Sequence, residues 1–427
     1  GYQSYLSLFL YKKHLGLVLR LFVILANFGD FIMDENYKKY RPTKVACYVG
    51  YIVQAIVNNF LPILFIVFQK EYGLSYEKLG RLILINFVTQ IFVDSITPKI
   101  ISAIGYKKTA VLCQGGAAVG LLMAGVLPLV LPNVYLALVS ALLVYSFSSG
   151  LMEVALSPMI EMLPTGNKSG NMSLLHSFYC WGQAFTVVVT TALVYIFGYG
   201  KWQFIPIIWA ILPAINTVCF MYVPVVEPPA EVKQDTLPEL IKSRKFRCFM
   251  VMMLCAGASE LAMSQWASMF AQNGLGVSKV VGDLAGPCAF ALFMGFGRLV
   301  YAAFSDRISF RRTIIAMSAT CFVCYIVVGL CNVAVLSLIA CAICGFTVSL
   351  SWPGTYSAGS SAFPNGGAVM FSVFALCGDL GCSFGPWLLG IVADNSSLNV
   401  GFLVSAAAPL IMIITALFFL KEKDFQN

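Results

Sequence analysis

Charged side chains are scarce in this sequence: Asp, Glu, Lys and Arg together make up 11% of its 427 residues. Soluble domains carry roughly 25% charged residues, and a water-facing surface of ordinary size cannot be built from less than half of that share. Apolar residues account for 59% of the chain. The composition therefore excludes a set of soluble domains and predicts an all-α membrane protein that crosses the bilayer many times.

Metal-binding and catalytic signatures are also missing. Cys321 and Cys324, like Cys341 and Cys344, have CxxC spacing, but no His-rich grouping accompanies them, and most of the 14 cysteines lie inside apolar runs as small packing residues. No loop cluster resembles a nucleophile–base pair, and no glycine-rich loop is placed to hold phosphates. We therefore expect no metal, no cofactor, no ATP hydrolysis and no enzymatic activity.

The net charge of +8 by itself would fit a nucleic-acid-binding protein. The basic residues, however, lie in short segments between apolar runs and are not collected on one module. We therefore expect no nucleic-acid partner, and the lipid bilayer is the expected partner of most of the surface.

Twelve apolar runs are long enough for the about 20 residues that cross a bilayer as a helix. The longest polar break, residues 225–246, divides the runs into six and six. This predicts an N-terminal bundle at 44–224, a cytoplasmic linker at 225–246 and a C-terminal bundle at 247–420, flanked by segments 1–43 and 421–427. The runs lie at 44–69, 79–101, 108–131, 136–162, 171–197, 203–224, 247–272, 281–303, 312–331, 334–353, 367–392 and 399–420.

The orientation of these spans follows from the distribution of Lys and Arg between the runs. Eighteen basic residues fall on the side that holds the linker and the tails, and five on the other side. Because basic loops stay in the cytoplasm, we expect both termini to be cytoplasmic and the protein to lie in the plasma membrane. Residues 14–33 are apolar but interrupted by Arg20 and Asp30, so an extra span, an interfacial helix and sequence upstream of a natural start at Met33 all remain open, the last being favoured.

The two sets of six runs repeat each other weakly, which indicates two pseudo-symmetric bundles. The matching positions occur in the same order in both halves. They are Gly150 with Pro158 against Gly345 with Pro353, and Gly182-Gln183 against Gly378-Asp379.

Five ionisable residues lie well inside the predicted spans: Asp94, Glu153, Glu260, Asp379 and Arg298. A charge at the middle of a bilayer costs roughly 2.5–3.5 kcal/mol on insertion scales, so such residues face water or a partner and are functional by default. The alternative is a structural ion pair that joins two helices. Asp94, near the cytoplasmic end of its run, is interpreted as a gate or helix-cap residue.

Buried amides, one carboxylate and aromatic rings gather in four of the runs, and this set suits a polyol, which needs hydrogen bonds at its hydroxyls and a flat apolar surface for its C–H face. The alternative for any single residue is hydrogen bonding between helices or anchoring at the interface. His176 could relay protons or act as a neutral hydrogen-bonding group. The candidate binding residues are Gln54, Asn58, Asn59, His176, Tyr179, Gln183, Glu260, Gln265, Trp266 and Trp352.

These features together resemble the major facilitator superfamily, whose two halves are parallel repeats. The resemblance is carried by the six-plus-six layout, by the cytoplasmic linker, and by a charged segment with a downstream glycine pattern. In the first half the matching charged segment is degraded, since Ser102 stands where an acid is expected. The residues that carry the likeness are Gly297-Arg298, Asp306-Arg307, Arg311-Arg312, Lys107-Lys108 and Gly381, Gly385-Pro386 and Gly390.

Within that superfamily the chain resembles the fucose–galactose–glucose:proton symporter branch. The matching segments are Asn58-Asn59 with Pro62, Gly150 to Glu153 with Ser157-Pro158, and 175–178 with Gly182. The resemblance implies that Glu153 binds the proton. Asn59 stands where the branch carries an Asp, so Asn59 is implied to contact sugar without titrating, and Ser157 replaces an Asn.

The resemblance also implies alternating access, in which two bundles expose a site first to one side and then to the other. We expect a monomeric proton-coupled sugar symporter with Glu153, Asp379 and Glu260 in the proton route; Na⁺ in place of H⁺ stays open. The alternatives are a proton-coupled exporter of amphipathic compounds and a transport-dead sensor on the same scaffold. The expected gating residues are Asp94, Lys107, Lys108, Asp306, Arg307 and Arg311.

Overall fold

A computed structural model describes residues 39–163, 168–226, 236–304, 309–331, 333–363 and 365–419. Within these ranges every regular element is a helix, and twelve helical spans are long and apolar enough to cross a membrane. The predicted all-α fold with twelve transmembrane helices is therefore confirmed. The spans lie at 41–72, 76–97, 99–130, 134–160, 174–197, 204–222, 244–274, 279–301, 310–330, 334–356, 372–395 and 398–418.

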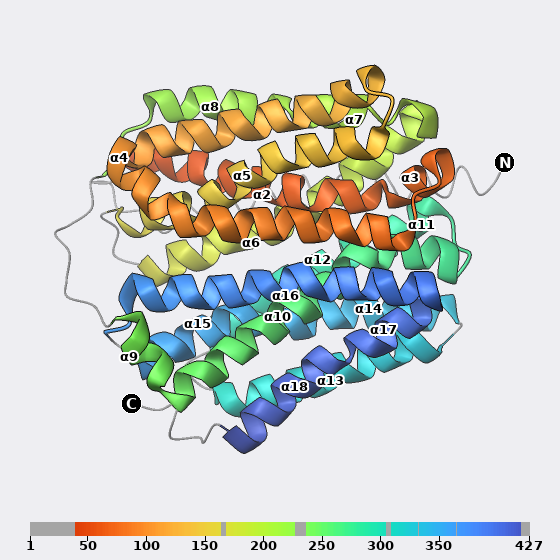
Figure 1. The fold of residues 1–427 in the computed structure, drawn as a ribbon. Helices are drawn as coiled ribbons and strands as arrows, with labels where there is room; N and C mark the ends of the chain where they lie inside the picture. Colours follow the sequence, from red (N-terminus) through yellow and green to blue (C-terminus); the bar gives the residue numbers. More distant parts are fainter. Residues whose placement is uncertain are drawn as a thin grey trace. The chain divides into compact units, whose positions relative to one another are not determined.

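The chain forms two compact units, which are described separately. Unit 1 holds the described residues up to Gly73, those from Phe92 through the sixth span, and Lys279–Leu284. Its helix α2 packs along α5, α6 and α8 (Figure 1). The elements of unit 1 are α2 (Arg41–Ile63), α3 (Phe65–Tyr72), most of α4 (Tyr76–Val130), α5 (Val134–Glu161), α6 (Lys168–Phe197), η2 (Tyr199–Lys201), α7 (Phe204–Trp209), α8 (Ile211–Tyr222) and α11 (Lys279–Asp283).

Unit 2 holds Leu74–Ile91, the described residues from the linker to Ser278, and those from Ala285 onward. Helix α10 runs against α16 along its length, and α12 and α13 pack on α14. Besides the start of α4, its elements are α9 (Leu237–Lys242), α10 (Arg244–Met269), η3 (Phe270–Gly274), η4 (Leu284–Cys288), α12 (Ala289–Phe304), α13 (Phe310–Leu330), α14 (Ala334–Val348), α15 (Ser351–Ala362), α16 (Gly367–Asn395), α17 (Leu398–Ser405), α18 (Ala407–Ile414) and η6 (Thr415–Phe419).

Two spans pass from one unit into the other. The second span begins in unit 2 and joins unit 1 at Phe92, whereas the eighth span begins in unit 1 and joins unit 2 at Ala285. These spans occupy the same place in the two sets of six. The crossing in the eighth span falls inside the π-helical turn η4, which contains Pro287.

Two helix interruptions differ from the predicted runs. The first run is divided at Leu64 into α2 and α3, two residues after Pro62. The second and third spans, which share the label α4, are two helices that meet at a kink, with Gly105 between them at φ 81° and ψ 163°. Glycine adopts positive φ without a Cβ clash, so this residue replaces the loop that the sequence predicts at 102–107.

Small residues allow the closest helix approaches inside each unit. A Cβ on Gly257 of α10 would lie 2.1 Å from the backbone oxygen of Gly378 on α16. In unit 1 a Cβ on Gly182 of α6 would lie 3.0 Å from Cα of Ile52 on α2. Helix packing in a bilayer depends on such contacts, and in both units they fix the helices that carry the candidate residues.

Candidate functional site

The polar cluster of unit 1 is centred on α2 and α5. The Gln54 side chain, 4% exposed, donates from Nε2 to Oε2 of Glu153 across 3.1 Å. Glu153 is half-buried, on the face of α5 that packs on α2. The structure thus brings together two residues that are 99 positions apart in the chain, one predicted to bind solute and the other to bind the proton.

Asn58 and Asn59 extend this cluster one turn along α2. The Ser149 hydroxyl on α5 donates to Oδ1 of Asn58 across 3.3 Å. Nδ2 of Asn59 donates to the carbonyl oxygen of Ala55, at 2.9 Å, and to the Tyr179 hydroxyl on α6, at 3.3 Å. Both amides are buried, at 6% and 4% exposure. The two neighbours therefore point to different helices, Asn58 to α5 and Asn59 to α6.

Tyr51, one turn before the Gln54 position, joins the same three helices. Its hydroxyl shares a short hydrogen bond with Ser157 on α5. Its ring meets the His176 ring edge-on, with centroids 5.3 Å apart. His176 and Tyr179 of α6 are half-buried, whereas Gln183, one turn farther along α6, is 3% exposed. The α2–α5–α6 contact thus holds six of the predicted binding residues.

Asp94 lies on α4 beside a glycine of α5. A Cβ built on Gly150 would be 3.1 Å from Oδ1 of Asp94 and 2.9 Å from Val93. Gly150 therefore lets the half-buried Asp94 approach α5, three residues before Glu153. Asp94 therefore lies beside α5, at a point close to Glu153 along that helix, and its interpretation as a gate or helix-cap residue stays a prediction.

The polar centre of unit 2 is an ion pair between α10 and α12. Nη2 of Arg298 lies 4.0 Å from Oε2 of Glu260, and the two side chains are 13% and 10% exposed. Arg298 Nη2 also contacts Met294 Sδ at 3.9 Å. Each charge reduces the cost of burying the other, so the pair explains how two charged residues are held inside apolar spans.

Trp352 and Asp379 lie beside the contact between α15 and α16. A Cβ on Gly378 would be 2.2 Å from Cη2 of Trp352, so the indole ring occupies the space above that glycine. Tyr356 adjoins the same indole, with ring centroids 6.3 Å apart. Asp379 follows Gly378 and is 3% exposed.

Gln265 and Trp266 are buried in α10, at 2% and 0% exposure. The indole nitrogen of Trp266 donates to the backbone oxygen of Pro386 on α16 across 2.9 Å. The indole N–H of Trp266 is therefore hydrogen-bonded within the protein. Trp266 also meets Tyr76 edge-on, with centroids 6.0 Å apart.

The predicted gating residues are distributed over both units. Lys107 is half-buried and Lys108 exposed in the middle of α4. Arg311, at the start of α13, donates from Nε to the Ala416 oxygen, at 3.0 Å, and from Nη2 to the Leu417 oxygen, at 2.9 Å. Arg311 thus caps carbonyls at the end of the last span. Asp306 and Arg307 lie outside the described residues.

Sequence reasoning missed a buried ion pair at the start of the eighth span. Lys279 Nζ lies 2.8 Å from Oδ2 of Asp283, whose side chain is fully buried. Thr191 of α6 donates to the same oxygen across 2.7 Å. The spacing of four residues between Lys279 and Asp283 was the available signal, because such pairs share a helix face.

The two clusters offer hydrogen-bonding groups and buried charge, which are means of binding a solute. Within the described ranges no group of three or more His, Cys, Asp or Glu side chains could hold a metal ion. The thiols of Cys321 and Cys344 are 3.7 Å apart between α13 and α14. Amide groups both donate and accept, so the unit 1 cluster suits a neutral solute that carries hydroxyl groups.

Comparison with known proteins agrees with this architecture. Residues 47–386 match the sequence model of the Major Facilitator Superfamily. A search of curated protein sequences finds no significant match.

Several solved structures share the fold. The E. coli fucose:proton symporter, in a single-residue variant, is 15% identical with a TM-score of 0.64, over 90% of this chain and all of that one. A D-xylose–proton symporter is 13% identical with a TM-score of 0.71, over 90% and 98% of the two chains. The nucleoside transporter NupG is 12% identical with a TM-score of 0.72, over 88% and 100%. At these identities the likeness concerns the fold.

Proposed function

The chain belongs to the major facilitator superfamily and is a multi-pass membrane transporter, and we propose that it carries a small polar solute of the sugar class together with a proton. Transport follows alternating access in this proposal. Asp379 and Glu260 join Glu153 as the candidates for the proton route.

The observation that carries the proposal is the contact between Gln54 and Glu153. A carboxylate inside a transmembrane unit is tied by a 3.1 Å hydrogen bond to a buried amide of the helix that also carries Asn58 and Asn59. The position that would take up a proton and the positions that would bind solute therefore lie on adjoining helices. A change in the charge of Glu153 reaches the amide cluster through one hydrogen bond.

The physical role of the proton is to remove a charge. Moving an ionised carboxylate through a closed, dry state is costly, and protonation of Glu153 avoids that cost. Coupling requires that proton and solute favour the same conformational change, since a ligand that binds two states equally shifts nothing. The hydroxyls of a bound sugar would form hydrogen bonds with the amides. The sugar would therefore favour closure of the transporter only while it is bound.

The proposed orientation in the membrane rests on the distribution of Lys and Arg between the spans. The excess of Lys and Arg on the side of the linker supports cytoplasmic termini, and we propose that the transporter lies in the plasma membrane as a monomer. Asp94, Lys107, Lys108 and Arg311 remain the candidates for closing its cytoplasmic side.

Uptake by purified protein in liposomes tests the proposal. A panel of radiolabelled hexoses, deoxyhexoses and nucleosides is offered with and without an imposed pH gradient, and with and without a Na⁺ gradient. Accumulation of a sugar above its external concentration, driven by inward proton flow, is the expected result. Accumulation that follows Na⁺ alone contradicts the proton route, and uptake restricted to nucleosides contradicts the solute class.

A further inference from the structure

The second and eighth spans begin with the same local structure. Gly73 and Gly276 both adopt positive φ, at 62° and 66°. Each is followed by an apolar residue, a serine and then the first residue of a span, Tyr76 or Lys279. These two spans are also the ones that change units along their length. The first residues of the two spans, Tyr76 and Lys279, therefore occupy equivalent positions in the two sets of six spans.

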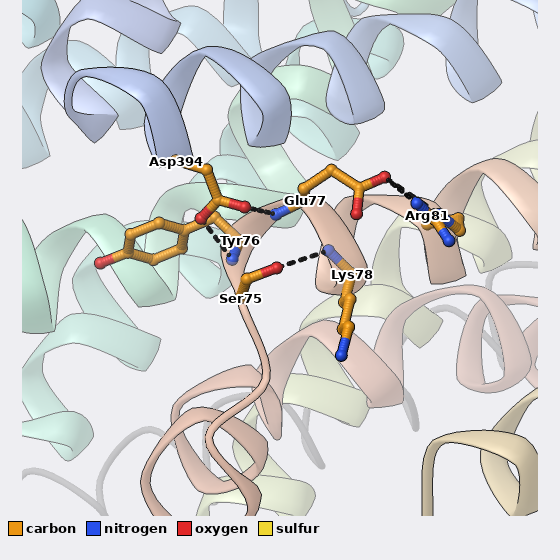
Figure 2. Close-up of polar contacts among 6 residues, drawn as sticks. All are labelled: Ser75, Tyr76, Glu77, Lys78, Arg81 and Asp394. Carbon is orange, nitrogen blue, oxygen red and sulfur yellow. Dashed lines mark hydrogen bonds and ion pairs between the residues drawn. The ribbon is translucent and has the colours of Figure 1, made fainter.

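The second span is capped by a carboxylate from the end of α16. Asp394 accepts hydrogen bonds from the backbone N–H of Tyr76, at 2.8 Å, and of Glu77, at 2.6 Å, one on each carboxylate oxygen (Figure 2). The first N–H groups of a helix have no partner within the helix, and an anion there is favoured by the helix dipole. The cap comes from a residue 318 positions away from Tyr76, whereas most helix caps are local.

Other contacts hold the same beginning in unit 2. Asn273, at the end of the seventh span, donates to the Tyr76 hydroxyl across 3.1 Å. A Cβ on Gly80 would lie 3.3 Å from Cα of Trp387, and a Cβ on Gly390 would lie 2.7 Å from the backbone oxygen of Tyr76. The first turns of α4 therefore lie directly against α16, and glycine makes room on both sides.

The eighth span is tied to α2 by the opposite charge. Lys279 Nζ donates to the backbone oxygen of Ile63 across 2.7 Å. Ile63 is the last residue of α2, and α3 begins two residues later at Phe65. The final carbonyls of a helix lack partners, and a cation there is favoured by the dipole. Asp283 and Thr191 hold the lysine and the start of the span in unit 1 through hydrogen bonds of 2.8 and 2.7 Å.

The two ties are complementary in chemistry. Asp394 places a negative charge on a helix N-terminus, and Lys279 places a positive charge on a helix C-terminus. In each case the tie holds the first turns of a span in a unit that the rest of that span does not belong to. For the eighth span the change of unit falls in the π-helical turn at Leu284–Cys288, and π-helical turns often mark functional positions within helices.

We propose that Asp394 and Lys279 are two halves of one latch, which holds segments 74–91 and 279–284 in the state that the structure shows and releases both segments when the transporter changes state. The inference rests on the proposed alternating access and is independent of the solute and the coupling ion. Because Asp394 is exposed, water replaces the protein donors when the cap opens. The latch can therefore break without leaving a buried charge unpaired at that end.

Hydrogen–deuterium exchange of the full chain in lipid nanodiscs tests the latch. Asp394→Ala removes both acceptors, and we expect exchange of the amides at 76–80 to accelerate on the order of tenfold, the ratio that corresponds to about 1.4 kcal/mol. The decisive readout is the other segment: exchange at 279–284 and at 61–66 should accelerate as well. Lys279→Met, which keeps the alkyl chain, should conversely accelerate exchange at 76–80.

Two further variants keep the test decisive. Asn395→Ala changes the next residue, whose side chain donates within its own helix to Ile391, and should leave exchange unchanged at both segments. Asp394→Asn keeps the shape and one strong acceptor and should give a smaller acceleration than alanine. Acceleration confined to 76–80 in Asp394→Ala would show a local helix cap and overturn the latch. No solute or gradient enters this experiment, so its result stands apart from that of the uptake assay.

Discussion

The amide nitrogen of Gln54 on α2 lies 3.1 Å from a carboxylate oxygen of Glu153 on α5. The distance is that of a hydrogen bond. When its carboxylate acceptor is ionised, such a bond is stronger than one between neutral groups. Protonation of Glu153 would weaken the contact and change what the amide offers to its surroundings. In the proposed transport cycle, this contact is the route by which a proton on Glu153 would alter the hydrogen bonds available to a solute.

Replacing the acid by its neutral analogue separates exchange from accumulation. Glu153→Gln keeps the size and a hydrogen-bonding group next to Gln54 but cannot release a proton. We expect solute counterflow to persist while the accumulation ratio under a pH gradient falls to one. Liposome uptake with preloaded and empty vesicles measures the two quantities. Retained uphill uptake would remove Glu153 from the proton route.

The ion pair in unit 2 should be costly to break and less costly to remove as a whole. Arg298→Met leaves Glu260 buried without its 4.0 Å partner, and breaking buried pairs costs roughly 3–5 kcal/mol. The double variant with Glu260→Gln should recover much of that loss. Thermal unfolding of all four proteins in detergent completes the cycle; additive losses would show that the two charges do not interact.

Two glycines of the α10–α16 contact should respond differently to alanine. At Gly257 the new Cβ meets backbone, 2.1 Å from the Gly378 oxygen, so the helices must separate; at Gly378 it meets the tip of the Trp352 ring at 2.2 Å. We expect Gly257→Ala to lower stability by roughly 1–3 kcal/mol. Gly378→Ala should lower stability less and reduce transport more, because the indole is displaced. Unfolding curves and initial uptake rates distinguish these outcomes, and equal stability losses would contradict the argument.

The short linker helix α9 should show acid-dependent capping. Hydrogen bonds from the Thr236 hydroxyl, at 2.7 Å, and backbone N–H, at 2.8 Å, hold the pKa of Glu239 below its usual range. Because the pKa of Glu239 is lower in the folded state, its ionised carboxylate stabilises α9 fully at pH values above the unfolded-state pKa of about 4.3. This stabilisation is lost as the pH falls through the folded-state pKa. Exchange of the α9 amides, corrected for intrinsic rates, should therefore rise only in acid. Glu239→Gln, which keeps an acceptor, should abolish this pH dependence.

The layout of spans was predictable because each crossing requires about 20 apolar residues, and that requirement is visible in any single run. The division of the first run at Leu64 was not predicted. The 102–107 segment was predicted as a loop, because hydropathy reports polarity and does not report that one glycine with positive φ can join two helices.

The candidate site was predictable as a set of residues and not as a set of contacts. Polar side chains inside apolar runs singled out Gln54 and Glu153, but their separation of 99 residues gives no sign that they touch. Trp266 illustrates the opposite case. Its position inside a run suggested a solute-stacking ring, and only the packing of α10 on α16 shows that its N–H is bound to Pro386.

The exchange of segments between the two units bears on how the protein could be produced in pieces. A fragment ending in the linker would lack Lys279–Leu284, and the complementary fragment would lack Leu74–Ile91, so neither would contain all of its own compact unit. Two fragments produced together would each have to supply a segment of the other's unit. The N-terminal fragment would supply Leu74–Ile91, and the C-terminal fragment would supply Lys279–Leu284. If assembly is joint in this way, the linker would act by raising the local concentration of the two halves of the chain.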